Sequence, residues 1–206
     1  MSSDELTTIA QEAARGGLFL FIGNASSTAI LALGAILVAR LLGPSSYGLY
    51  ALTGTVPTLL TGLSDAGMNT ALIRLPARVR SEGDQARANR LIRLGFLFKV
   101  AISAIAVIVC YAGSTLIATI VLNRPELASF LRLASLAIAF QAIYDASCNA
   151  FIGQDLMQYS AGIRILQAVL KGTLGPAFVF IGLGISGAIW GYVLAFAAAG
   201  FIGSSI

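Results

Sequence analysis

The sequence has no histidine, only two cysteines and few charged residues. Without histidine the chain cannot carry Ser-His-Asp or Cys-His catalysis, and it has no imidazole to bind a metal or relay a proton. Cys110 and Cys148 both lie in hydrophobic stretches, where packing is a more common role than a disulfide. Charged residues make up 11% of the chain and hydrophobic residues 57%, a balance too apolar for an ordinary soluble domain. We therefore expect an integral membrane protein that is not an enzyme, with no catalytic residue, metal or cofactor.

The chain has instead long uncharged intervals of nearly constant length. Twenty-four residues separate Arg15 from Arg40, and another twenty-four separate Arg40 from Asp65. A hydrocarbon core of about 30 Å needs about 20 apolar residues per helical crossing. We predict an all-α polytopic membrane bundle of about six transmembrane helices over residues 16–206, preceded by a cytoplasmic N-terminal segment, 1–15. The predicted spans are residues 16–42, 47–73, 94–122, 128–152, 158–182 and 184–206.

The most strongly charged connection follows the second predicted span. It runs from Arg74 to Arg93 and holds six arginines against Glu82 and Asp84. Short arginine-rich loops stay in the cytoplasm, because cationic segments resist translocation. We therefore expect this loop and the N-terminus on the cytoplasmic side of the cell membrane, and the turn at 43–48 outside. The loop supplies most of the net charge of +4, so no nucleic-acid partner is implied. It could also bind anionic lipid headgroups.

Proline and glycine mark the ends and bends of the predicted helices. Pro44, Pro125 and the glycine-rich stretch 182–187 lie between spans and predict turns. Pro57 and Pro176 lie inside spans and should kink them, because proline removes a backbone donor and displaces a carbonyl. Small residues on the faces of spans one and six favour close helix packing. These small residues are Gly23, Ser27, Gly34, Gly182, Gly184, Gly187 and Gly191.

Two neighbouring spans each carry a stripe of polar side chains on one helix face. The stripes are Gln141, Asp145 and Asn149 in span four, and Arg164, Gln167 and Lys171 in span five. Ionisable groups inside a membrane are costly and usually face protein or water. Asp145 and Arg164 have matching depths, about 10 Å from the inner ends of their spans, so we expect them to pair. Lys171 lies deeper, without an obvious carboxylate partner, and we expect it to face a polar cavity suited to an anionic substrate.

The alternative role of such groups is structural, because opposite charges can neutralise each other and hold two helices together. Amides such as Asn24 most often form interhelical hydrogen bonds, whereas Asp65 is a lone carboxylate near the inner end of its span. Arg40, Lys99 and Arg132 lie near span ends, where snorkelling to the headgroups is expected. The candidate cavity residues are Asn24, Asp65, Gln141, Asp145, Asn149, Arg164, Gln167 and Lys171.

Two segments carry a specific resemblance. They are Val38-Ala-Arg-Leu-Leu-Gly-Pro-Ser-Ser-Tyr-Gly-Leu-Tyr-Ala51 and Asp65-Ala-Gly-Met-Asn-Thr-Ala-Leu-Ile-Arg74. Both resemble polysaccharide-biosynthesis membrane proteins of the oligosaccharide flippase (Wzx-like) family, within the multidrug/oligosaccharidyl-lipid/polysaccharide exporter superfamily. The remaining spans match that family in spacing and hydrophobicity alone. Taken by itself, Leu-Gly-Pro at 42–44 predicts a sharp helix end and a tight hairpin.

The resemblance implies two six-helix lobes around a central cavity that opens alternately to either side of the membrane. Such proteins translocate a lipid-linked oligosaccharide, a polysaccharide precursor, which they would hold by its anionic phosphate-bearing head. This chain has the spans of one lobe and looks like the N-terminal one, apparently truncated relative to the family. Besides the lipid bilayer, its expected partner is therefore a second six-helix lobe, as a missing C-terminal half, a split partner or a second copy.

Two other functions remain open. One is an ion-coupled small-molecule exporter of the same superfamily, in which Asp65 or Asp145 would be the cation-coupling site. The hairpin motif and the deep cationic site favour the glycan interpretation over this one. The second is a non-transporting scaffold in glycan assembly. A membrane enzyme is disfavoured by the missing histidines and by the lack of paired carboxylates at mid-span.

Overall fold

The computed structural model describes the backbone of residues 3–65 and 67–205, and the side chains within these ranges from residue 14 onward. Within these ranges the elements are all helical, which confirms the predicted all-α membrane bundle. In chain order they are α1 (Ser3–Asp65), α2 (Met68–Ser81), α3 (Gln85–Leu116), the π-helical turn η1 (Ile117–Val121), α4 (Leu127–Gly153), α5 (Met157–Phe178), a second π-helical turn η2 (Val179–Leu183) and α6 (Gly184–Ser205).

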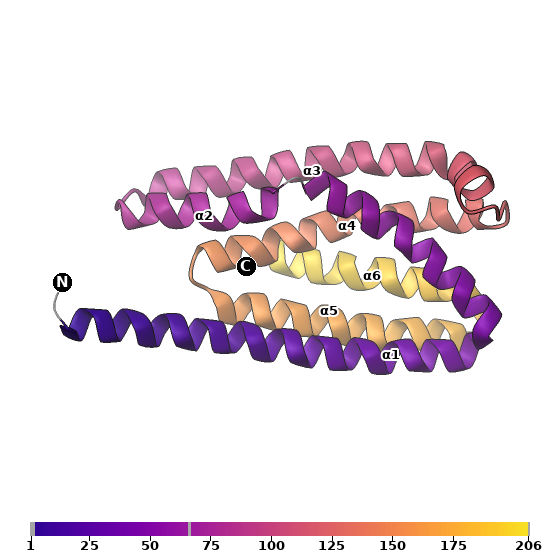
Figure 1. Cartoon of the computed structure of the whole chain (residues 1–206), viewed down its shortest axis with the longest axis horizontal. Coiled ribbons are helices and arrows are strands. Elements are labelled where there is room, and N and C mark those ends of the chain that lie inside the picture. Colours follow the sequence, from indigo (N-terminus) through magenta and orange to yellow (C-terminus); the bar gives the residue numbers. More distant parts are fainter. Residues whose placement is uncertain (1–2, 66, 206) are drawn as a thin grey trace.

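Helix α1 is a pair of helices that fold back at Gly43. This residue has φ 75° and ψ 166°, a backbone conformation that L side chains rarely adopt, and Pro44 follows it. In Figure 1 the first leg of α1 runs along one side of the bundle, and the second leg returns at an angle toward α2. The structure therefore has the tight turn at the predicted Leu-Gly-Pro position. The first leg includes residues 3–15, so this segment continues into the first span without a break.

Four helical runs among the described residues are long and apolar enough to cross a membrane, and the first of them includes most of α1 together with α2. They are Ala14–Ser81, Gln85–Val121, Leu127–Gly153 and Met157–Ser205. The first run bends at Gly43, and the last bends at Gly182 and Gly184, all three with positive φ. Figure 1 shows α5 and α6 side by side and antiparallel as a result. The four runs thus provide six legs, one for each predicted span, and the chain is a multi-pass membrane protein.

The arginine-rich segment is a helical hairpin, whereas the sequence predicted a loop over 74–93. Span two ends at Asp65 instead of near residue 73, and α2 and the start of α3 pack side by side with only three residues between them (Figure 1). The reason is that α2 is amphipathic: its apolar face, Leu72, Pro76 and Val79, is buried while Arg74 and Arg78 are exposed. The side chain of Asp84 caps α3 by accepting the Arg87 N–H at 2.9 Å.

Close approach of small residues sets the packing of the bundle. The first leg of α1 packs along α5, and α6 packs against both α4 and α5. A methyl group added at Gly34 would lie only 2.6 Å from Cα of Gly172, which shows how closely α1 and α5 cross there. The main buried cluster lies between α4 and α6 and includes the edge-to-face contacts of Phe196 with Tyr144 and Tyr192. Close packing through small-residue faces, predicted for spans one and six, is therefore confirmed.

Candidate functional site

Lys171 lines a cavity of about 330 Å³ between the second leg of α1 and helices α4, α5 and α6. Its ammonium Nζ lies 4.4 Å from the ring centroid of Tyr192, a cation–π distance. Tyr50, Thr53 and Thr58 add hydroxyl groups from α1. In the part of the chain that the structure describes, Lys171 forms no ion pair. Thr53 and Thr58 donate their hydroxyl protons to the backbone oxygens of Leu49 and Gly54. The groups left to donate to an anionic oxygen are therefore the Lys171 ammonium and the Tyr50 hydroxyl.

Gln141 does not line this cavity itself but contacts Tyr192, which does. Its Oε1 accepts a hydrogen bond from the Tyr192 hydroxyl at 3.1 Å, which links α4 to α6. This bond holds the ring over which Lys171 lies. Gln167, the neighbouring polar residue of the predicted stripe on α5, has a buried side chain. Lys171 and Gln141 thus come together through Tyr192, a residue that the sequence analysis did not select. Its spacing from those residues along the chain gave no signal for this contact.

Arg164 points toward the first leg of α1. Its guanidinium donates to Asn24 Oδ1 at 3.4 Å and to Ser160 Oγ at 3.5 Å. Among the described residues, Asp145 and Arg164 form no ion pair, so the predicted direct pair is absent. Arg164 instead uses one acceptor on α1, which packs along α5, and one on its own helix. Asn24 and Arg164, both predicted site residues, are therefore neighbours in the structure.

Asp65 is part of a buried polar network that joins four helices. Lys99 Nζ lies 3.3 Å from Asp65 Oδ1 and also donates to Asn69 Oδ1. Asn149 Nδ2 donates to the same Asn69 oxygen at 2.6 Å. The Asn69 N–H in turn donates to Asp65 Oδ1 at 3.2 Å. Asp65 and Asn149 are predicted site residues, and the network places them together with α2 and α3.

The prediction for Lys99 was wrong. The sequence analysis expected it to snorkel to the headgroups, but its side chain is 4% exposed. An oppositely charged carboxylate and an amide within reach replace the water that snorkelling would provide. The signal was available, because Asp65 ends one span and Lys99 begins the next on the same side of the membrane. Arg132, for which snorkelling was also expected, is exposed and donates to the hydroxyls of Ser114 and Thr115 at 3.1 Å.

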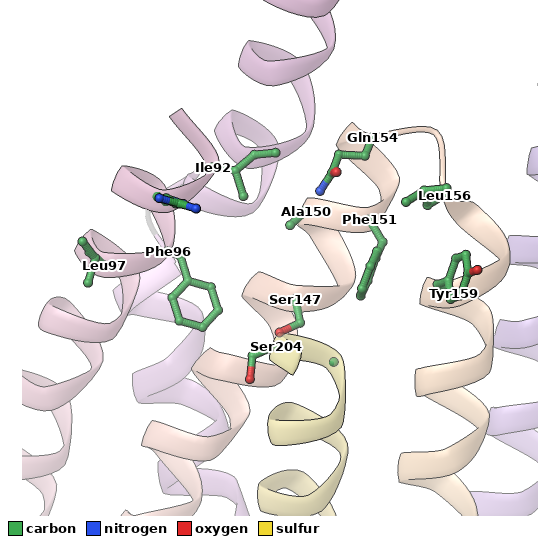
Figure 2. A pocket seen from close by; sticks show the side chains of 12 residues that line it. Ile92, Phe96, Leu97, Ser147, Ala150, Phe151, Gln154, Leu156, Tyr159 and Ser204 are labelled. Carbon is green, nitrogen blue, oxygen red and sulfur yellow. The ribbon is translucent and has the colours of Figure 1, made fainter. Parts of the chain in front are cut away.

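A second, larger cavity of about 670 Å³ lies between α3, α4, α5 and the last turn of α6, and it contains none of the predicted site residues. Figure 2 shows Phe96 on α3, Phe151 on α4 and Tyr159 on α5 around it, with Ser204 at the end of α6. Phe151 and Tyr159 stack with ring centroids 5.8 Å apart. The cavity is mainly aromatic and apolar, and Arg93 is the one charged residue that lines it. The eight predicted residues therefore divide among separate places instead of lining one cavity.

Comparison with proteins of known structure identifies the fold. A multidrug resistance MATE family transporter of the MOP superfamily, in an outward-facing conformation, superposes with a TM-score of 0.76 at 14% identity, over 88% of this chain and 42% of that chain. A MATE protein in the straight conformation gives 0.74 at 18% identity, over 98% and 46%. A MOP superfamily transporter from Pyrococcus furiosus gives 0.72 at 18% identity, over 94% and 43%. The chain thus has the fold of one half of these transporters and spans less than half of their length.

The sequence comparison gives the family. No match is found among curated proteins. The family model described as polysaccharide biosynthesis protein, in contrast, matches residues 13–206, which is nearly all of the chain. This match includes both segments that carried the resemblance and extends it over all six legs. The chain therefore belongs to the polysaccharide biosynthesis protein family.

Proposed function

We propose that this chain is one lobe of a transporter that moves a lipid-linked oligosaccharide across the cytoplasmic membrane by alternating access. A second six-helix lobe, from the same or another chain, completes the central cavity. The N-terminus and the α2–α3 hairpin lie on the cytoplasmic side in this proposal. Family membership and the half-transporter fold support the transport class, and the chemistry of the polar residues supports an anionic substrate.

The observation that carries the proposal is the position of Lys171. A lysine in the middle of a span is costly unless it is paired or faces a cavity. Lys171 lies at a hydroxyl-lined cavity and has Tyr192 as its charge-stabilising neighbour. An ammonium group acts on phosphate as a point charge with three donors. The phosphate of a lipid-linked glycan is a ligand of the right charge for this cavity.

Arg164 is the second cation assigned to substrate. Its two hydrogen bonds, to Asn24 and Ser160, are long and involve neutral acceptors only. Such bonds orient the guanidinium without neutralising it, so its charge is available to a phosphate group. A guanidinium can hold two phosphate oxygens at once, which an ammonium does not. In this proposal Arg164 fixes the orientation of the head and Lys171 supplies charge deeper in the lobe.

The ion-coupled exporter is the second candidate, and one observation favours it. Asp145 is partly buried in α4 and forms no ion pair among the described residues. A carboxylate in this state can bind a proton or a metal cation during transport. Asp65 is less suited to that role because its carboxylate already forms an ion pair with Lys99. Loss of ion-coupled drug efflux in Asp145→Asn, with glycan export unaffected, would favour the exporter.

The proposal is tested with the two-lobe protein in a strain that depends on it for surface glycan. Lys171→Ala and Arg164→Ala should each reduce glycan export about tenfold to a hundredfold, because a charge-assisted hydrogen bond contributes about 1.5–3 kcal/mol. Lys171→Arg and Arg164→Lys should restore part of the export. Arg132→Ala is the matched control, since Arg132 is a membrane cation bound only to hydroxyls of α3.

Protein abundance and membrane insertion are measured in parallel by immunoblotting. Full export by abundant Lys171→Ala and Arg164→Ala proteins would overturn the substrate site. If the strain loses export without the chain and these variants restore it fully, the result would instead favour the non-transporting scaffold.

A further inference from the structure

The α2–α3 hairpin carries an apolar groove that opens to the outside of the bundle. The groove has a volume of about 350 Å³ and lies between Leu72 and Leu75 on α2 and Leu91, Leu94 and Phe98 on α3. Three of these side chains are largely exposed: Leu75 at 51%, Leu94 at 56% and Phe98 at 55%. Within the described chain nothing covers this face, and the function proposed above does not use it.

A second cavity continues the groove toward the tip of the hairpin. It has a volume of about 360 Å³, shares Leu91 with the groove, and is lined by Asp84, Arg87 and Arg90. Both arginines are exposed and form no ion pair in the described part of the chain. The Asp84 carboxylate is occupied in part by capping α3. Two cations against one carboxylate leave this end of the groove positive.

The two cavities form one track that is apolar at one end and cationic at the other. Arg87, Leu91, Leu94 and Phe98 are spaced i, i+4, i+7 and i+11, so they share one face of α3. Arg90 and Phe98 lie about 12 Å apart along the helix axis at a rise of about 1.5 Å per residue. The apolar end is the one nearer the middle of the membrane-capable run Gln85–Val121, because Phe98 lies further along that run than Arg87 and Arg90.

A phospholipid in a membrane leaflet has the same arrangement, with its acyl chains toward the membrane interior and its headgroup at the surface. We propose that the hairpin groove binds an anionic phospholipid, with its acyl chain along Leu94 and Phe98 and its phosphate-bearing headgroup at Arg87 and Arg90. A zwitterionic lipid would fill the apolar part equally well but would gain less from the two arginines. The site lies on the outer face of the hairpin and is independent of the proposed substrate cavity.

The test uses fluorescence quenching by brominated lipids, with the tryptophan placed in the groove. The chain has one tryptophan, Trp190, so Trp190→Phe with Leu75→Trp gives a protein whose fluorescence reports on the groove alone. Brominated phosphatidylglycerol should quench it at a lower mole fraction than brominated phosphatidylcholine. The matched control is Trp190→Phe with Ile105→Trp, because Ile105 is an exposed α3 residue outside the groove. There the two lipids should quench equally.

Arginine variants in the Leu75→Trp protein test the headgroup contact. Arg87→Ala and Arg90→Ala should each reduce the preference for phosphatidylglycerol about fivefold, from the usual contribution of one basic residue at an anionic surface. Arg78→Ala should leave it unchanged, because Arg78 is paired with Glu82 and does not line the groove. Size-exclusion profiles establish that each variant is folded. Equal quenching by both lipids in the folded Leu75→Trp protein would overturn the proposal, as would an effect of Arg78→Ala equal to that of Arg87→Ala.

A soluble competitor distinguishes binding of the whole lipid from binding of a free phosphate compound. Glycerol 3-phosphate should leave quenching by brominated phosphatidylglycerol unchanged, because the proposed site holds the acyl chain as well as the phosphate. Complete displacement by glycerol 3-phosphate would mean that the arginines bind a free phosphate compound, and the lipid site would be wrong.

Discussion

The basic side chains within the membrane-spanning legs have three different environments. Lys99 is buried against a carboxylate and an amide, Arg132 donates to two hydroxyls, and Lys171 lies over an aromatic ring beside a cavity. Only the first of these neutralises the charge with an opposite charge. A lysine without a carboxylate inside a membrane protein usually marks a ligand pathway. At the scale of single residues, Lys99 is therefore a structural cation, and Lys171 is the cation that the proposed function assigns to substrate.

The Asp65–Lys99 pair should stabilise the bundle, and removing only one of the two charges should cost more stability than removing both. Lys99→Met leaves Asp65 without its cation, and we expect the loss to be about 3 kcal/mol, at the low end of the range for breaking a buried pair because Asp65 is 26% exposed. Thermal denaturation in detergent and membrane abundance measure it. The double variant Asp65→Asn with Lys99→Met should recover most of the stability, because no buried charge is left unpaired.

The control for this experiment is Arg132→Met, which removes a membrane cation that has no carboxylate partner. It should change the melting temperature much less than Lys99→Met. If the double variant melts no higher than Lys99→Met alone, the pair is not the source of the stability.

At the scale of whole elements, the bundle depends on two kinds of glycine. Gly43 allows the chain to reverse between the legs of α1, and Gly34 allows the first leg to approach α5. Both keep α1 against α5, the helix that carries Arg164 and Lys171. Tight contact of backbones is the usual way in which membrane helices associate, since lipid tails are as apolar as leucine.

Gly34→Ala should destabilise the bundle by about 1–3 kcal/mol, the typical cost of overpacking. The added methyl group would lie 2.6 Å from Cα of Gly172, and that backbone atom cannot move as a side chain would. Gly54→Ala is the matched control, because no atom lies within 4 Å of a methyl group there. It should be neutral or slightly stabilising, as alanine favours a helix over glycine. Melting temperatures in detergent compare the two, and equal values would show that the α1–α5 crossing tolerates separation.

At the scale of the whole molecule, the charge of the lobe predicts the direction in which it lies in the membrane. The hairpin of α2 and α3 gathers six arginines between Arg74 and Arg93 at one end of the bundle. The 37-residue run Gln85–Val121 would be about 55 Å long at about 1.5 Å per residue, well beyond a core of about 30 Å. The arginine end of α3 therefore extends past the hydrocarbon core, as a positive segment on the cytoplasmic side should.

Cysteine labelling in intact cells tests this orientation. Ser81→Cys at the tip of the hairpin should be protected from a membrane-impermeant maleimide, whereas Ser45→Cys in the opposite turn should react rapidly. Both positions are exposed. The natural thiols, Cys110 and Cys148, are buried and give a low background. Rapid labelling of Ser81→Cys from outside, with Ser45→Cys protected, would reverse the predicted orientation.

Composition and local spacing determined the class of the molecule and most of its outline. Long uncharged intervals predicted six legs, and Leu-Gly-Pro at 42–44 predicted the first hairpin, because helix length in a membrane and helix ends depend on residues close in sequence. The small-residue faces also predicted where helices approach. The helical hairpin of the arginine-rich segment was not predicted, since its high charge suggested a loop although α2 has buried apolar positions.

Only the tertiary structure decided which polar groups meet. The sequence placed Asp145 and Arg164 at equal depth, yet Arg164 donates to Asn24 on α1, and Asp65 pairs with Lys99 from α3. Depth along a helix follows from residue number, because the rise per residue is constant. The partner of a buried side chain depends in addition on how each helix is rotated and on which neighbour it packs against, and those are properties of the folded bundle.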